Sequence, residues 1–171
     1  MISSDGIPAG SVCVLDTNVM LYAHQHVSDA ASRVLHRCAA ADIIGILPAP
    51  VWEELCHRLM VAEAVATGRI VGPKPARKLA EHPEIVRSLT AYRRSLAELA
   101  AMGLQFEPVR RADVLETALD LQKRFGLLTN DSIITAAAMR LGAGYLVTAG
   151  AGFASAAEVE IAVLGDIRTS G

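Results

Sequence analysis

The sequence predicts an α/β fold, a three-layer α/β/α sandwich around a mainly parallel sheet. Short apolar runs typical of buried strands alternate with longer amphipathic or alanine-rich segments. Apolar residues make up 52% of the 171 residues and charged residues only 20%, so the chain can bury a sizeable core. No internal repeat or low-complexity linker interrupts this pattern. We therefore expect residues 1–171 to form a single domain, with its core at about 12–165.

The predicted strands are short and apolar. The first, at 12–15, contains apolar residues only, which is typical of a strand covered on both faces of a parallel sheet. Further strands are expected at 43–47, 105–109, 145–148 and 159–164.

Helices are expected between these strands. Ser28 is placed to cap a helix that runs to about Ala41, while Pro48 and Pro50 end the second strand and begin the next helix. The stretch near 61–102 is expected to contain a helical hairpin. Other helical segments are expected at about 83–102, 112–125 and 132–141.

Charge is divided unevenly along the chain. The 16 Lys and Arg and 18 Asp and Glu give a formal net charge of −2, which disfavours binding of nucleic acid through bulk charge. Aromatic residues are only 4%, which disfavours rows of base-stacking rings. The segment 69–94 nevertheless contains seven cations against two acids, either as a solvated helical face or as a surface for RNA or a partner. Its cations are Arg69, Lys74, Arg77, Lys78, Arg87, Arg93 and Arg94.

The cysteines and the first residues of the sequence indicate the cellular compartment of the protein. The three cysteines are an odd number without metal-ligand spacing, so we expect small buried side chains in a reducing compartment. Residues 1–11 contain no basic and apolar signal segment, and no apolar stretch is long enough to cross a bilayer. A cytoplasmic protein without a membrane partner is expected.

Three carboxylates are candidates for a site at the carboxyl edge of the sheet, where ligands of open parallel sheets gather. Asp16 follows the first strand directly, and Asp131 stands at the start of a helix; capping is the alternative role for both. Glu54 lies early in the helix after the second strand, where it or Glu53 can face that edge. Carboxylates about 5 Å apart repel by about 3 kcal/mol at an effective dielectric constant near 20. Such a cluster must bind a cation or take up protons.

These residues lie in sequence pieces that resemble the PIN domain family, and particularly its VapC-like toxin ribonucleases. In frame with Leu55, the helical glutamate of the family falls on Glu54. The residues near 61–102 then form an insertion in the family fold. The matching pieces are Val14-Leu15-Asp16-Thr17-Asn18-Val19, Pro-Val-Trp-Glu-Glu-Leu at 50–55, Leu-Leu-Thr-Asn-Asp-Ser-Ile-Ile-Thr-Ala-Ala at 127–137, and Tyr145-Leu146-Val147-Thr148 with Phe153.

The resemblance implies an endoribonuclease in which Asp16, Glu54 and Asp131 hold Mg²⁺ or Mn²⁺. The metal would activate water for attack on an RNA phosphodiester, and oxygen ligands suit such hard ions. The resemblance also implies the toxin of a toxin–antitoxin pair, a homodimer that binds a small cognate antitoxin. The residues expected to position the substrate are Thr17, Asn18, Asn130 and Thr148.

The loop after the fourth strand departs from the family pattern. The family places acids in a loop of the type Thr-x-Asp-x-Asp-Phe, whereas this chain has Gly150 and Gly152. This difference leaves three alternatives. Three acids and one metal suffice for catalysis, or another residue replaces the missing acid as a ligand, or the chain is a catalytically weakened protein that binds RNA or antitoxin. The candidates for compensation are Asn130, Glu158 and Asp166.

Two other α/β families fit the sequence less well. A haloacid-dehalogenase-like phosphatase needs a second Asp where this chain has Asn18, and a receiver domain needs paired acids after its first strand. No Gly-rich phosphate loop is present to support nucleotide binding.

Overall fold

The computed structural model describes residues 1–153 and 158–167, apart from the side chain of Ala151. The strands form one six-stranded sheet in the order β1-β6-β5-β2-β3-β4, and every pair is parallel. The predicted α/β fold is confirmed, with the sheet parallel throughout. The strands are β1 (Ile2–Ser3), β2 (Val12–Leu15), β3 (Ile44–Pro48), β4 (Gln105–Glu107), β5 (Tyr145–Thr148) and β6 (Glu160–Val163). The predicted domain includes residues 154–157 and 168–171, which lie outside the described part, so its bounds stay a prediction.

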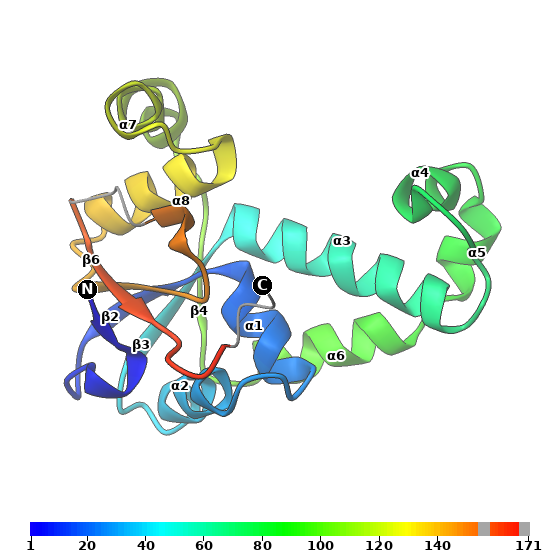
Figure 1. Ribbon diagram of the computed structural model, residues 1–171, viewed down its shortest axis with the longest axis horizontal. Helices are drawn as coiled ribbons and strands as arrows, with labels where there is room; N and C mark the ends of the chain where they lie inside the picture. The colour runs from blue at the N-terminus through cyan, green and yellow to red at the C-terminus, as the bar shows by residue number, and fades with distance from the viewer. Residues whose placement is uncertain (154–157, 168–171) are drawn as a thin grey trace.

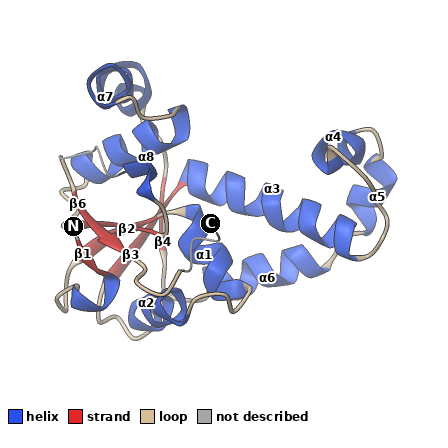
Figure 2. Cartoon of the chain, viewed as in Figure 1, coloured by secondary structure: helices blue, strands red, loops and turns tan. Residues whose placement is uncertain are grey.

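Helices cover both faces of this sheet (Figure 2). One face is covered by α8, with α7 outside it, and the other by α1 and α2. Within residues 1–153 and 158–167, no helix is long and apolar enough to cross a membrane. The helices are α1 (Thr17–His24), α2 (Asp29–Ala39), α3 (Ala49–Ala66), α4 (Pro75–Ala80), α5 (Pro83–Ser88), α6 (Ala91–Ala100), a π-helical segment (Asp113–Ala118), α7 (Leu119–Phe125) and α8 (Thr129–Arg140).

The central strand β2 is buried on both faces, as its apolar sequence predicts. Cys13, Val14 and Leu15 are fully buried between the helical layers. Cys13 and Cys38 are free thiols in this core, and burial raises the pKa of the Cys13 thiol to about 12. The fold therefore uses these two cysteines as small apolar side chains.

An arm of two helices projects from the sheet (Figure 1). It consists of α3 and α6, which pack side by side, with α4 and α5 at the far end. This arm is the predicted helical hairpin, but the continuous helix predicted at 83–102 is wrong. The chain breaks after α5, where Leu89 is buried and the carboxylate of Glu63 accepts hydrogen bonds from the backbone N–H groups of Thr90 (2.9 Å) and Tyr92 (2.8 Å). A side chain of α3 thus caps the start of α6.

Two polar contacts fix the position of α8 beneath the sheet edge. Near its C-terminal end, Arg140 donates to Asp113 (2.9 Å) and to Glu107 (2.8 Å), which joins α8 to the π-helical segment and β4. In its first turn, the buried Ser132 accepts a hydrogen bond from Gln122 of α7 at 2.9 Å. Both ends of α8 are therefore fixed, and Asp131 lies in the first turn of this helix.

Gly45 allows β3 to pack closely against its neighbours, and its substitution tests this packing. A Cβ atom at residue 45 would lie 2.5 Å from Cys38 Sγ and 2.8 Å from Leu104 Cδ2. We expect Gly45→Ala to lower the free energy of unfolding by about 1–3 kcal/mol, because an overpacked core must shift. Gly144→Ala is the control, since the nearest atom to its Cβ is 3.8 Å away. Urea unfolding of both variants measures the difference, and equal stabilities would contradict this account.

Candidate functional site

Asp16 ends β2 and begins α1 at the carboxyl edge of the sheet. Its backbone N–H donates to Val147 of β5 (3.0 Å), so it continues the strand pairing. Its side chain is 6% exposed and makes no capping hydrogen bond to α1. Instead, Oδ2 accepts hydrogen bonds from the hydroxyl of Thr148 (3.0 Å) and the amide of Asn18 (3.4 Å). Capping therefore does not explain this carboxylate.

Glu54 reaches the same edge from the first turns of α3. Its Oε2 accepts a hydrogen bond from the hydroxyl of Thr17 at 3.2 Å. Its neighbour Glu53 is exposed, and its side chain makes no hydrogen bond or ion pair within the described residues. The side chain of Glu54 is 36% exposed, so it lies at the border between the sheet edge and solvent. Thr17 thus joins the beginning of α1 to α3.

Asp131 lies in the first turn of α8, and its side chain faces the glycine loop after β5. A Cβ atom on Gly152 would lie 3.3 Å from Asp131 Oδ2. The loop itself is held by the backbone N–H of Gly150, which donates to the hydroxyl of Thr148 (3.1 Å). A glycine at residue 152 therefore leaves room beside the carboxylate where any side chain would touch it.

The three carboxylates act on one another electrostatically. Burial raises the pKa of Asp16, and the charge of Glu54 raises it further. Burial also raises the pKa of Asp131, with added contributions from Asp16 and Glu54. A capped or ion-paired carboxylate would have the opposite shift. The site therefore concentrates negative charge that the folded chain does not neutralise at Asp16 or Asp131.

Arg58 is a functional candidate that the sequence interpretation missed. Its Nη1 donates to Asn18 Oδ1 (3.0 Å) and lies 3.5 Å from Glu54 Oε1. Because Asn18 also donates to Asp16, Arg58 connects the two acids through one amide. The only signal in the sequence is its spacing of four residues from Glu54, which puts both on one helix face.

The structure does not bring all the predicted residues to this edge. Asn130 is exposed, and its side chain makes no hydrogen bond in the described part of the chain. Glu158 binds Arg124 at 2.6 Å, and Asp166 accepts hydrogen bonds from Ser28 (2.6 Å) and the backbone of Ala30 (2.9 Å). Their proposed compensating role is therefore wrong, because both carboxylates are already used elsewhere.

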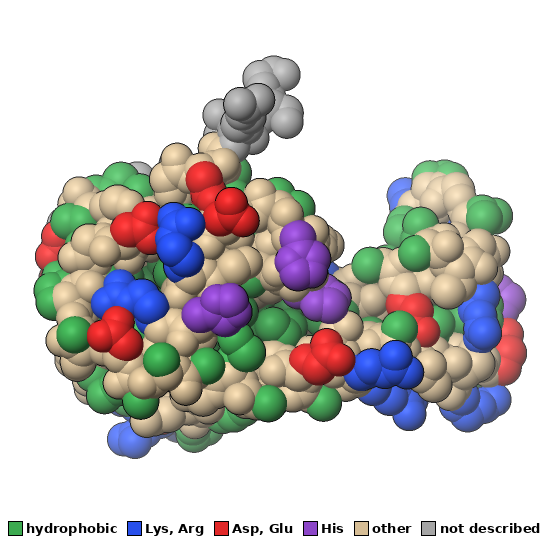
Figure 3. All heavy atoms as spheres, turned by 90° about the horizontal axis from the view of Figure 1, so that it is seen from below, with side chains coloured by type: hydrophobic (Ala, Val, Ile, Leu, Met, Phe, Trp, Pro, Cys, Tyr) green, Lys and Arg blue, Asp and Glu red, His purple; other side chains and the backbone are tan. Residues whose placement is uncertain are grey.

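The cations of segment 69–94 lie on the arm, away from the acids (Figure 1). Figure 3 shows Lys and Arg side chains spread along the arm on one face of the molecule. Several of them serve the arm itself. Lys78 donates to Val71 O (2.6 Å), Arg69 donates to Ser88, and Arg77 lies 3.5 Å from Glu81.

The carboxylate oxygens of this edge are the ligand type that a hard divalent cation prefers, although the described side chains do not surround a metal site in their present positions. Among the described residues, no three His, Cys, Asp or Glu side chains lie close enough together to hold a metal ion as they stand. Asp16 and Asp131 offer oxygen ligands, and no cationic side chain of the described residues pairs with either. Burial and the neighbouring carboxylates raise the pKa values of both groups, and a bound cation would offset this cost. A divalent ion with oxygen ligands fits that role.

The burial of Asp16, with the charge of Glu54 added to it, predicts that neutralisation of this carboxylate stabilises the metal-free protein. Because the folded state raises the pKa of Asp16, it binds more protons than the unfolded chain above pH ~4, and stability falls as pH rises through that range. Asp16→Asn keeps an oxygen that accepts from Thr148 and Asn18. In EDTA at pH 7, we expect a higher Tm for Asp16→Asn than for the wild type, and a smaller difference near pH 4. A lower Tm at pH 7 would contradict the cost of burying this charge.

Comparison with known proteins places these features in a family. The model of the PIN domain matches residues 13–159. A search of curated proteins finds no significant match. Three solved structures share the fold at 17% identity. They are VapBC2 from Rickettsia felis bound to a DNA fragment from their promoter (TM-score 0.58, covering 88% of this chain and 96% of that chain), a toxin–antitoxin complex from Klebsiella pneumoniae (0.54, 91% and 99%) and FitAcB from Neisseria gonorrhoeae (0.50, 91% and 99%).

The family match includes every element that builds the acidic edge. It begins in β2, one strand residue after Val12, extends past Gly152 and ends one residue before β6. The likeness to the solved structures independently supports the same parallel sheet with flanking helices. On this match, the chain belongs to the PIN domain family.

Proposed function

We propose that the chain is a metal-dependent endoribonuclease that uses Mg²⁺ or Mn²⁺. The observation that carries this proposal is the buried carboxylate of Asp16, whose pKa is raised beside Glu54 and which has no cationic partner among the described residues. Asp131 has the same character. Keeping such groups together costs stability, so a function that needs the charge is the simplest reason for them.

Asp16, Glu54 and Asp131 would hold the metal, and polar neighbours would orient them. When bound, a divalent ion lowers the pKa of a coordinated water and offsets charge on the phosphate. Thr148 and Asn18 fix the rotamer of Asp16 by hydrogen bonds, and Thr17 does the same for Glu54. The roles predicted for Thr17, Asn18 and Thr148 are therefore best assigned to positioning the acids.

We propose further that the ribonuclease is the toxin of a toxin–antitoxin pair. The support is the likeness of its fold to chains from VapBC2, FitAcB and a Klebsiella pneumoniae toxin–antitoxin complex. The corresponding partners are a small cognate antitoxin and a second copy of the chain, with which it forms a homodimer. The arm offers cations for RNA or for a partner, and the side chains of Lys74 and Arg94 have no hydrogen-bond or ion-pair partner in the described part of the chain.

A second candidate is a catalytically weakened protein that binds RNA or antitoxin. The observation in its favour is Gly152, which stands beside Asp131 Oδ2 where the family pattern has an acid. Gly150 likewise offers no ligand. The first candidate is preferred because the three remaining acids still repel one another at one edge.

RNA cleavage by matched variants tests the first candidate. Several kcal/mol of transition-state charge stabilisation depend on the metal, so Asp16→Asn and Glu54→Gln should each reduce cleavage in Mg²⁺ or Mn²⁺ at least about 100-fold. Glu53→Gln is the control and should retain the wild-type rate, because Glu53 is exposed on the other side of the helix turn. A folded wild-type protein that is as inert as Asp16→Asn would disprove the ribonuclease activity.

Substitution of Gly152 separates the two candidates. Its φ lies outside the left-handed region, so a side chain needs only a shift of a few tenths of an ångström from Asp131. If three acids suffice, Gly152→Asp should change the cleavage rate at saturating metal by no more than about threefold, with Gly152→Asn as the uncharged control. A gain of about tenfold or more in Gly152→Asp alone would favour the weakened protein.

A further inference from the structure

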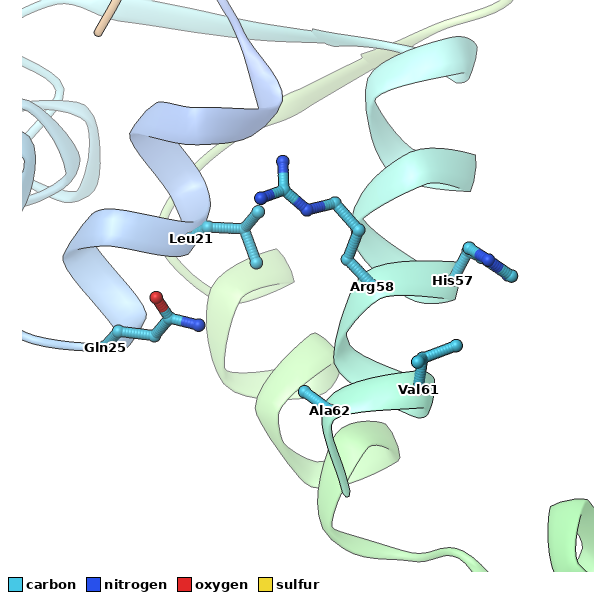
Figure 4. A pocket seen from close by; sticks show the side chains of 6 residues that line it. All are labelled: Leu21, Gln25, His57, Arg58, Val61 and Ala62. Atoms are coloured by element: carbon cyan, nitrogen blue, oxygen red, sulfur yellow. The ribbon is translucent and has the colours of Figure 1, made fainter. Parts of the chain in front are cut away.

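A pocket of about 350 Å³ lies between α1 and α3, directly beside the acidic edge. Its lining residues are Leu21, Gln25, His57, Arg58, Val61 and Ala62. Figure 4 shows Leu21 and Gln25 of α1 pointing toward α3, with Arg58 reaching back between the two helices. His57 and Val61 extend along the other side of α3, and α6 passes behind.

Arg58 connects this pocket to the acidic edge. It lines the pocket, and the same guanidinium donates to Asn18 and lies 3.5 Å from Glu54. Along α1, the pocket residues Leu21 and Gln25 follow Asn18 by one and two turns. Along α3, Arg58 follows Glu54 by one turn, or about 5.4 Å.

The lining of the pocket matches a nucleotide rather than a cation. Among the described residues that line it, none is acidic, whereas Arg58, His57 and Gln25 all offer hydrogen-bond donors. Arg58 presents a planar fork that fits phosphate oxygens. Gln25, which points toward α3 across the pocket, offers an amide donor and acceptor of the kind that contact a base or a ribose hydroxyl. Single-stranded RNA carries phosphate and such groups in every residue.

We propose that this pocket is a subsite for one nucleotide of the RNA substrate, next to the scissile phosphate. Arg58 contacts the phosphate that joins that nucleotide to the acidic edge. The inference rests on the proposed function, because it takes RNA as the substrate, but it concerns binding and can be tested without cleavage. Arg58 would add this phosphate to its present contacts with Asn18 and Glu54.

Binding of a fluorescent single-stranded RNA to the Asp16→Asn protein tests the subsite, since that background leaves the RNA uncut. Fluorescence anisotropy at fixed salt should show that Arg58→Gln weakens binding about tenfold and that Arg58→Lys restores part of the loss. Ala62→Phe changes no charge and fills the pocket from an exposed helix position, and it should weaken binding by a similar factor. Arg33→Gln on α2 is the control for lost charge and should bind within twofold of the parent.

Photo-crosslinking with RNA that contains 4-thiouridine gives the location. Crosslinked peptides should contain residues of α1 and α3 around 21–25 and 57–62. Unchanged binding in both Arg58→Gln and Ala62→Phe, with circular dichroism showing folded variants, would overturn the proposal. So would crosslinks confined to the arm at 74–94. An inert wild type with Arg58-dependent RNA binding would reject the proposed activity and leave the subsite standing.

Discussion

The buried carboxylate of Asp16 is the constraint on which the rest of the site depends. It is 6% exposed, and the chain supplies hydroxyl and amide donors to it but no cation. This follows from topology, because β2 lies between β3 and β5 in the sheet, α8 packs against it, and α1 begins directly after Asp16. Thr148 reaches Asp16 because β5 pairs with β2 in parallel and both strands end at the same edge. The same edge then receives Asp131 and Glu54, and the repulsion among them must be met by the solvent, a proton or a metal.

The sequence predicted this arrangement where the residues concerned are set by local pattern. Asp16 could be placed because a wholly apolar run ends abruptly in a polar residue, and parallel strands share their carboxyl edge. Helix geometry indicates that one of the neighbours Glu53 and Glu54 faces this edge, and the resemblance to the PIN domain family, in frame with Leu55, implies that it is Glu54. The strands were predicted to within two residues at each end, except for β1. That strand has only two residues and pairs with β6, far away in the sequence, so no local pattern marks it.

The features that the sequence could not predict depend on side chains from distant segments. The break between α5 and α6 is made by Glu63 of α3, which caps the backbone of Thr90 and Tyr92, 27 and 29 residues later in the chain. Although burial alone would raise the pKa of Glu63, these backbone N–H groups hold it below its usual value. Arg58 was missed for a similar reason. An Arg four residues after a Glu is the common surface ion pair, and only the presence of Asn18 opposite gives it another role.

If the site holds a divalent ion as proposed, Arg58 and Gly152 both reduce the negative charge that the ion has to offset. Asp16, Glu54 and Asp131 contribute three negative charges when ionised, and Arg58 beside Glu54 returns one positive charge, leaving −2. One Mg²⁺ or Mn²⁺ cancels that sum. An aspartate at residue 152 would lie against Asp131 and increase the negative charge beyond what one ion neutralises. Glycine at residue 152 in place of a fourth acid, and Arg58 as an added cation, thus both make the net charge of the site less negative. The formal net charge of −2 for the whole chain is consistent with this balance, because the excess of cations lies on the arm and the clustered acids lie at the sheet edge.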